Sequence, residues 1–179
     1  ENAEIPVYTF NVDTKKNNNV SATISKKGGH IVYLNCDRNV SEEKISNDEA
    51  KDKGLKFLKG KGIDNMKETY YLKEEGILTV NYAYEQNGVV IYPDLIKLKI
   101  ALDNGEILGM ETSGYFNNHH KRSIPKAKIT KEQAKKNLNK NLDIRSEGMA
   151  IIPTEWESEV LCYEFKGKID ETEYLVYIN

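Results

Sequence analysis

The chain has few of the residues that mark disulfide-stapled, metal-bound or membrane-spanning proteins. It contains 179 residues, of which only Cys36 and Cys162 are cysteine, and it has no Cys-x-x-Cys pair. Two distant cysteines supply neither a zinc site nor a disulfide framework, so we expect both to be buried as small hydrophobic residues. Apolar runs are only a few residues long, which predicts no transmembrane helix or signal peptide in this sequence.

Neither sign of charge is in large excess, and an initial methionine is lacking. The chain carries 26 Lys and Arg against 28 Asp and Glu, for a net charge of -2. This near balance predicts no nucleic-acid partner and no general binding to polyanions. The first residues, ENAEIPVYTF, lead us to expect part of a longer protein, with any targeting segment upstream. Tyrosines outnumber phenylalanines, 11 to 4, which favours substantial strand content.

What the sequence does contain is an internal repeat. ISNDEAKDKGLKFL at residues 45–58 matches ITKEQAKKNLNKNL at residues 129–142. In each, a Ser or Thr follows the first Ile, and a Glu or Gln comes three residues after it. This spacing is a capping box, in which two side chains satisfy backbone N–H groups at the start of a helix. With roughly helical apolar spacing after each box, the sequence predicts helices over 47–60 and 131–141.

Strand-like runs follow each predicted helix. The hairpin over 95–111 turns at Asp103-Asn104-Gly105, a strong turn signal between β-forming residues. Residues 20–35 align with residues 96–111, so the N-terminal part corresponds to the end of the same repeat. The predicted strands and hairpins span residues 7–13, 20–35, 68–72, 77–84, 95–111, 148–153, 159–165 and 173–179.

We predict an α+β fold of tandem units, each one helix packed on an antiparallel β-sheet meander. Residues 1–40 are the C-terminal strand part of a first unit, 41–115 a complete second unit, 116–127 a linker, and 128–179 a third unit truncated at its last strand. Unpaired strand edges in the incomplete units predict a homodimer through edge-strand pairing or strand exchange. The side chains expected to face the core are Phe57, Leu58, Leu78, Val80, Ile100 and Ile107 in the second unit and Ala134, Leu138, Leu142, Leu161, Tyr163 and Ile178 in the third.

The stretch GYFNNHHKRSIP, at residues 114–125, holds two of the three histidines. His119 and His120 are adjacent, so their side chains diverge on a strand or a helix, and no acid or cysteine lies nearby at ligand spacing. The sequence therefore predicts no metal site here. The closing proline and the Asn and His residues predict a turn that joins the second and third units. Tyr115 and Arg122 are the side chains expected to fix this joint.

The sequence also lacks a catalytic constellation. No Gly-x-Ser-x-Gly elbow is present, and no cysteine combines with histidine and asparagine in a recognisable pattern. In PTEWESE, at residues 153–159, Trp156 between acids would suit stacking on a glycan, but the three alternating glutamates favour one solvated face. We predict no enzyme, no catalytic residue, no cofactor and no metal.

The repeat resembles a known family. The helix start at residues 130–134, a strand meander and DNGEILGME at residues 103–111 are similar to the PepSY repeat. GYFNNHHKRSIP, KITKEQA, MAIIPTE, VLCYEF and YLVYIN, in this order, resemble the C-terminal region of the YpeB family of spore germination proteins. KKGGHIVYLN near the start fits the same family. The resemblance extends over essentially the whole chain.

The resemblance implies a non-catalytic interaction module of a spore germination protein that is membrane-anchored in its full length. The implied location is the outer side of the inner spore membrane in an endospore-forming bacterium. The implied partner is a SleB-like cortex-lytic hydrolase, which the module would stabilise, localise or inhibit in the dormant spore. A peptidoglycan-binding module and a peptidase-inhibitor-like domain stay open as alternatives. The candidate partner or inter-unit contacts are Tyr115, His119, His120, Arg122 and Trp156.

Overall fold

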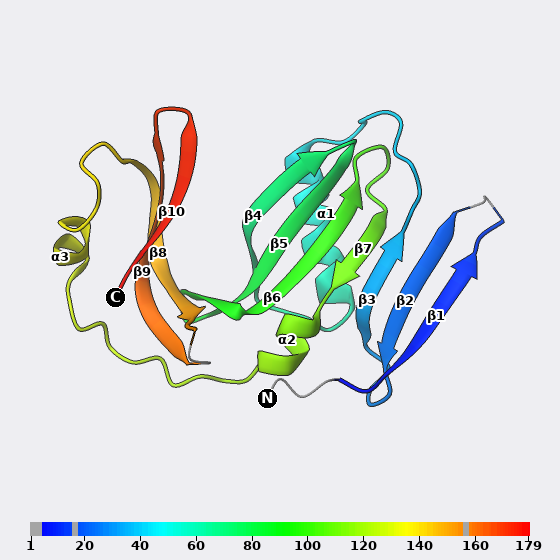
Figure 1. The fold of residues 1–179 in the computed structure, drawn as a ribbon, viewed down its shortest axis with the longest axis horizontal. Helices are drawn as coiled ribbons and strands as arrows, with labels where there is room; N and C mark the ends of the chain where they lie inside the picture. Colours follow the sequence, from blue (N-terminus) through cyan, green and yellow to red (C-terminus); the bar gives the residue numbers. More distant parts are fainter. Residues whose placement is uncertain (1–4, 16–17, 156–157) are drawn as a thin grey trace. The chain divides into compact units, whose positions relative to one another are not determined.

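A computed structural model describes residues 5–15, 18–155 and 158–179 of the chain. The fold is α+β and consists mostly of strands (Figure 1). It divides into two compact units, one formed by Glu1–Tyr84 with Asp94–His119 and the other by Glu85–Pro93 with His120–Asn179. In chain order the elements are β1 (Val7–Asp13), β2 (Asn19–Ser25), β3 (Ile31–Cys36), α1 (Asn47–Gly60), β4 (Met66–Glu74), β5 (Ile77–Gln86), β6 (Val89–Ala101), β7 (Ile107–Glu111), α2 (Ser113–Asn118), α3 (Lys131–Lys135), β8 (Asp143–Pro153), β9 (Glu159–Ile169) and β10 (Thr172–Ile178).

Helix α1 begins and ends where the sequence predicts. The Ser46 side chain accepts a hydrogen bond from the Glu49 backbone N–H at 3.1 Å, which caps the first turn. At the other end the backbone N–H of Lys61 bonds to carbonyls of the last turn, and Gly62 follows with φ of 77°. The buried face of α1 carries Ala50, Gly54 and Leu58, small and apolar residues that let the helix lie close to the sheet.

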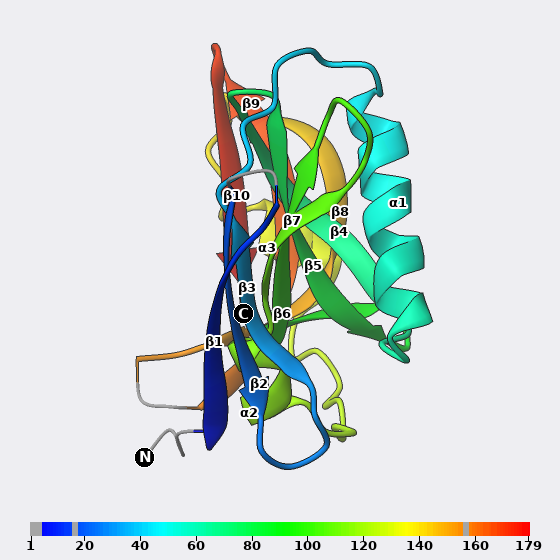
Figure 2. The ribbon, with the colours of Figure 1, turned by 90° about the vertical axis from the view of Figure 1, so that its right-hand side faces the viewer.

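The sheet of the first unit joins the N-terminal strands to the meander that follows α1. Its strand order is β1-β2-β3-β7-β6-β5-β4, and the β3–β7 pair makes the join, with Leu34 opposite Met110. Helix α1 covers one face of this sheet, as Figure 2 shows. The core below it consists of the buried residues Ala50, Leu58, Ile63, Leu78, Val80, Tyr82, Ile96, Leu98, Ile100, Leu102 and Met110.

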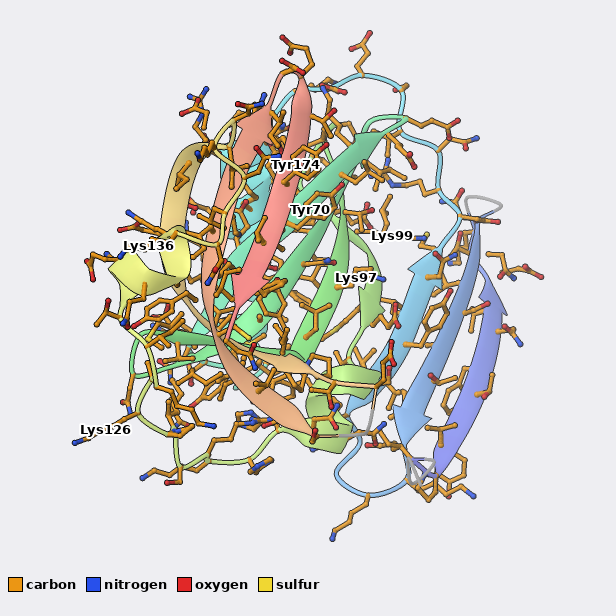
Figure 3. All side chains as sticks on the ribbon, turned by 60° about the vertical axis from the view of Figure 1, so that its left-hand side comes forward. Tyr70, Lys97, Lys99, Lys126, Lys136 and Tyr174 are labelled. Atoms are coloured by element: carbon orange, nitrogen blue, oxygen red, sulfur yellow. The ribbon has the colours of Figure 1, made fainter. Side chains whose placement is uncertain are left out.

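The two faces of this sheet differ in chemistry. Along β6, Leu98 points into the core under α1, so its neighbours Lys97 and Lys99 project from the opposite face (Figure 3). The core reaches β3 through Ile31 and Leu34. Farther out, the edge strand β1 exposes alternate apolar side chains, with 57% of Tyr8, 48% of Phe10 and 55% of Val12 accessible to solvent. Strand β4 likewise exposes three apolar side chains, Tyr70, Tyr71 and Leu72.

The second unit is not a purely antiparallel meander, which corrects the predicted topology. Strands β8, β9 and β10 pair antiparallel, but the first residues of β6 pair in parallel with β8, and Val90 lies opposite Ala150. The β5–β6 hairpin turns at Asn87-Gly88, both with positive φ, so its tip can extend into this unit. The parallel pair joins residues far apart in sequence, and no local pattern indicates it.

A polar network accompanies this pairing. The Tyr92 hydroxyl lies 2.5 Å from Oε2 of the buried Glu164, and the Tyr92 and Tyr177 rings meet edge to face with centroids 5.8 Å apart. Burial and the Glu164 carboxylate both raise the pKa of Tyr92, so its hydroxyl stays protonated and donates. The network therefore satisfies a carboxylate that would be costly to bury alone.

Helix α3 is shorter than predicted. Its capping box is present, since Gln133 N–H donates to Thr130 Oγ1 at 3.2 Å and Thr130 N–H donates to Gln133 Oε1 at 2.8 Å. The helix nevertheless ends at Lys135 and not at residue 141. Asparagine at alternate positions after it explains the early end, because Asn side chains compete for backbone groups. The Asn139 side chain accepts such a bond from the Asn141 N–H at 2.9 Å.

Most of the predicted core side chains are fully buried in the second predicted unit, whereas most are only half-buried in the third. Leu58, Leu78, Val80 and Ile100 are buried, and Phe57 and Ile107 are half-buried against the core. A helix of five residues covers little of a sheet, so most of the third set is only half-buried. The predicted domain boundaries themselves stay a prediction. In the third set Ala134 is buried, whereas Leu138, Leu142, Leu161, Tyr163 and Ile178 are half-buried.

Both cysteines are free thiols; Cys162 is buried as expected, whereas Cys36 is only half-buried. Burial raises the pKa of the Cys162 thiol, which disfavours the reactive thiolate. Over the described part of the chain, no helix has both the length and the apolar character needed to cross a membrane.

Candidate functional site

The stretch Gly114–Pro125 begins in a helix that the sequence did not indicate. Thr112 is buried at the end of β7, and its hydroxyl donates to the Ile31 carbonyl at 2.7 Å. The Phe116 N–H then donates to the Thr112 carbonyl at 3.0 Å, and the short helix α2 follows. The closing proline and the Asn and His residues predict a turn here. Instead, a helix begins directly after Thr112, which is anchored to β3 by its hydrogen bonds.

In the first unit, His119 is held by a buried carboxylate and two aromatic rings. Its Nδ1 lies 2.7 Å from Oδ2 of Asp94, a side chain with no exposed surface. The Tyr115 ring stacks on the imidazole with centroids 4.3 Å apart and an interplanar angle of 15°. The Tyr84 ring meets it edge-on at 4.6 Å. A buried carboxylate needs such a partner, so this cluster fixes the end of α2.

The chemistry of the His119 cluster favours anchoring over catalysis. A His–Asp pair is also part of a catalytic triad, but a triad needs a nucleophile at the imidazole. The ring contacts of His119 are instead with Tyr115 and Tyr84. Burial, with a further contribution from the Asp94 charge, raises the pKa of Tyr115, so its phenol stays neutral. The cluster is a packed polar joint within the first unit.

In the second unit, Arg122 is almost completely buried and forms a bidentate ion pair. Its Nε donates to Glu159 Oε2 at 2.7 Å, and its Nη2 donates to Oε1 at 2.6 Å. Its Nη1 donates to the His120 carbonyl at 3.2 Å. These charge-assisted hydrogen bonds hold the pKa of the Glu159 carboxyl below its ordinary range. Glu159 is exposed, as expected for a solvated face, but its carboxylate is also the counter-charge of Arg122.

A side-chain amide clamps the backbone of the same arginine. Gln86 Nε2 donates to the Arg122 carbonyl at 2.7 Å, and the Arg122 N–H donates to Gln86 Oε1 at 3.0 Å. The amide thus makes the two bonds that a neighbouring strand would make. Sequence reasoning missed Gln86, Glu159 and Asp94, and no spacing or local pattern in the chain could have identified them.

A cleft of about 270 Å³ lies beside this pair. Besides the Arg122–Glu159 pair, its polar lining includes His120, Lys121 and Ser123, while Ile151 and Leu161 provide apolar surface. Such a surface suits a polypeptide that carries acidic and apolar side chains. The described residues contain no group of three or more His, Cys, Asp or Glu side chains placed to hold a metal ion.

The predicted contact residues therefore fall into separate places. Tyr115 and His119 come together in the first unit. His120 and Arg122 line the cleft of the second unit. Trp156 lies outside the described residues. A role of these side chains in partner binding stays a prediction.

Comparisons with known proteins find related families along nearly the whole chain. Residues 1–125 match the family described as "YpeB sporulation, PepSY1 and PepSY2 domains", and residues 128–179 match "Peptidase propeptide and YPEB domain". The chain is 35% identical over its full length to the sporulation protein YpeB of Oceanobacillus iheyensis, of which it covers 40%. It is 40% identical over 158 residues to YpeB of Bacillus subtilis, with 87% of this chain and 35% of that protein covered.

A solved structure is also similar. The Bacillus megaterium YpeB C-terminal domain matches with a TM-score of 0.89 and 34% sequence identity. The match covers 100% of this chain and 80% of that one. Compared with the curated sequences, however, the chain spans only 40% and 35% of the relatives' length.

Proposed function

Because the chain belongs to the YpeB family of sporulation proteins, we propose that it is a non-catalytic interaction module for a SleB-like spore cortex-lytic hydrolase. In this proposal the module stabilises, localises or inhibits the hydrolase in the dormant spore, on the outer side of the inner spore membrane. Cortex breakdown at germination then depends on the release or activation of that hydrolase. The module is built from tandem PepSY units.

Family membership is the observation that carries the proposal. The family matched by residues 128–179 is named for peptidase propeptides, segments that accompany a hydrolase. A domain of this type acts through contacts and not through its own chemistry. The clusters around His119 and Arg122 fit this role, since their polar groups are engaged in holding the chain.

Two kinds of surface are available for the contact. The first is the cleft of the second unit, where Lys121 is exposed beside apolar Leu161. The second is the set of edge strands β1, β4 and β10, to which a partner strand can add through backbone hydrogen bonds. On β10, Tyr174 and Leu175 are exposed and would increase the apolar area of such a contact. The same edges would serve a homodimer.

Calorimetric titration of the purified hydrolase into this chain tests direct association. We expect saturable binding, and we expect Lys121→Glu to weaken it by about tenfold, because charge reversal beside the cleft repels an acidic partner. Lys126→Glu and Lys136→Glu are matched controls, since both lysines are exposed and lie outside the cleft lining (Figure 3).

Three results would overturn parts of this proposal. Failure of the full-length protein to bind the hydrolase would remove direct association. An equal loss of affinity in all three lysine variants would remove the cleft as the contact. Muramidase or peptidase activity in the purified chain alone would contradict a non-catalytic module.

A further inference from the structure

The first unit contains a second pocket, at the end of the sheet where β2 turns into β3 and where α2 lies (Figure 1). Its volume is about 180 Å³. Its apolar floor includes Ile63 and Met110, which belong to the buried core below α1. The pocket therefore opens directly onto the hydrophobic core. Its apolar lining is Ile31, Ile63, Met110 and Phe116, and its basic lining is His30 and Lys61.

The β2–β3 turn holds the His30 ring in place. Gly28 and Gly29 both have positive φ, 84° and 66°, a conformation that favours glycine. A Cβ atom on Gly28 would lie 2.5 Å from His30 Nε2, so glycine allows the imidazole to fold back over the turn. The His30 and Phe116 rings have centroids 4.8 Å apart. Both rings line the pocket.

The C-terminal end of α1 supplies the lysine of the lining. Lys61 is the C-cap residue, and its Nζ lies 5.5 Å from the centroid of the Phe57 ring. The end of a helix carries partial negative charge, which Lys59 and Lys61 offset. Every residue that lines the pocket is described, and none of them is acidic. The electrostatics therefore favour an anionic group at the rim, next to an apolar group inside.

We propose that this pocket binds the C-terminal residue of a polypeptide that ends in an aliphatic side chain. The side chain enters the apolar floor, and the α-carboxylate lies between His30 and Lys61. A chain end carries both groups on one Cα atom, which matches a small pocket with a basic rim. The volume is below that of a drug-sized ligand site and suits one side chain.

A chain end also fits the pocket better than an internal residue does. A peptide bound by its last residue extends out of the pocket in one direction. A peptide bound by an internal residue extends out of the pocket in two directions. The His30 and Phe116 rings, tilted by 31° with centroids 4.8 Å apart, both line the pocket and would restrict one of those directions. This inference goes beyond the proposed hydrolase partnership and does not depend on it, because the pocket and the cleft are formed by different residues.

A nuclear magnetic resonance titration of the 179-residue chain tests the inference. The probe is N-acetyl-Gly-Ser-Gly-Leu with a free carboxyl group, compared with the same peptide as its C-terminal amide. We expect saturable shifts at Gly29, Ile31, Ile63 and Met110 with the free acid. The amide should bind at least about fivefold more weakly, because it loses the charge-assisted contacts. Added salt should weaken the acid more than the amide.

Lys61→Ala should reduce affinity for the acid by several-fold. Lys56→Ala is the matched control, because Lys56 is exposed on the same helix and does not line the pocket. His30→Gln should act in the same direction as Lys61→Ala. Circular dichroism and the unfolding midpoint show whether each variant keeps the fold.

Equal affinity for the acid and the amide would overturn the carboxylate contact, and so would equal effects of Lys61→Ala and Lys56→Ala. Equally tight binding of N-acetyl-Gly-Leu-Asp-Gly-amide would overturn the chain-end assignment. Absence of shifts at the pocket with the acid at about 10 mM would overturn the site itself. The hydrolase is not part of this titration, so its outcome is separate from the test of the proposed function.

Discussion

Replacing Glu159 with glutamine removes the counter-charge of a nearly buried arginine. The Arg122 side chain is 4% exposed and that of Glu159 is 32% exposed. Glu159→Gln keeps the size of the side chain and one acceptor oxygen, and it removes the negative charge. The variant therefore isolates the electrostatic part of the pair with little change in packing.

The expected loss of stability lies between two limits. Breaking a fully buried ion pair by removal of one partner costs about 3–5 kcal/mol, because the other charge stays buried. A single hydrogen bond to a charged group contributes about 1.5–3 kcal/mol. Solvent reaches about a third of Glu159 and screens part of the effect, and glutamine retains one bond. We expect Glu159→Gln to destabilise the second unit by about 2–3 kcal/mol at neutral pH.

The pH dependence gives a second, independent measure. Arg122 holds the pKa of the Glu159 carboxyl below its ordinary value of 4.5. A lowered carboxyl pKa contributes stability that is fully present above the unfolded-state pKa and is lost as pH falls through the folded-state pKa. The difference between wild type and Glu159→Gln should therefore be constant from pH 7 to about pH 5 and should shrink below about pH 4.5.

Native-state hydrogen exchange of the β8 and β9 amides is the appropriate assay, since it reports the stability of one part of the chain. Asp143→Asn is the matched control, because Asp143 pairs with Arg145 at 2.7 Å and both side chains are more than 60% exposed, at 64% and 66%. We expect this control to cost no more than about 0.5 kcal/mol. Two results would refute a buried, stabilising ion pair. One is an equal loss of unfolding free energy in Glu159→Gln and Asp143→Asn. The other is a stability difference between wild type and Glu159→Gln that does not shrink in acid.

Three further substitutions test the packing of α1 and the hydrogen bond of Tyr92. Gly54→Ala places a methyl group against the Tyr82 hydroxyl inside the core, so it should destabilise the first unit by about 1–3 kcal/mol. Gly60→Ala is the control, because the space around its Cβ is open. It should be neutral or stabilise the unit by up to about 1 kcal/mol. Denaturant melts compare the two, and a similar loss for both would contradict close packing at Gly54. Tyr92→Phe removes the 2.5 Å hydrogen bond to buried Glu164 and should cost about 1.5–3 kcal/mol, measured by exchange of the β9 amides. An unchanged exchange rate would show that this bond contributes nothing to stability.

Much of the local structure follows from short sequence patterns. The capping signals at Ser46 and Thr130 predict the starts of α1 and α3, since the bonds that form a cap lie within four residues. Alternating strands and the turn at residues 103–105 predict the hairpin of β6 and β7 in the same way. The end of α3 was predicted too late, although its asparagines are a local signal that weighs against helix.

The sequence identifies some members of the two polar clusters, and their role in partner binding stays a prediction. Tyr115, His119 and Arg122 were selected because they stand in a polar stretch between repeats. Their partners were not selected, and the structure shows why. Asp94 is 25 residues from His119, and Glu159 is 37 residues from Arg122. The chain has 28 acidic residues, and the position of an acid in the sequence does not show which one a folded arginine or histidine will meet.

The sequence by itself determined the family, the α+β class, the repeat and the position of nearly every strand. These properties depend on contacts between near neighbours or on the order of segments along the chain. Only the tertiary structure decided the parallel pairing of β6 with β8, the short helix α2 and the ion pair of Arg122. Each of these depends on which distant groups are brought together when apolar surface is buried, and that choice is made by the fold as a whole.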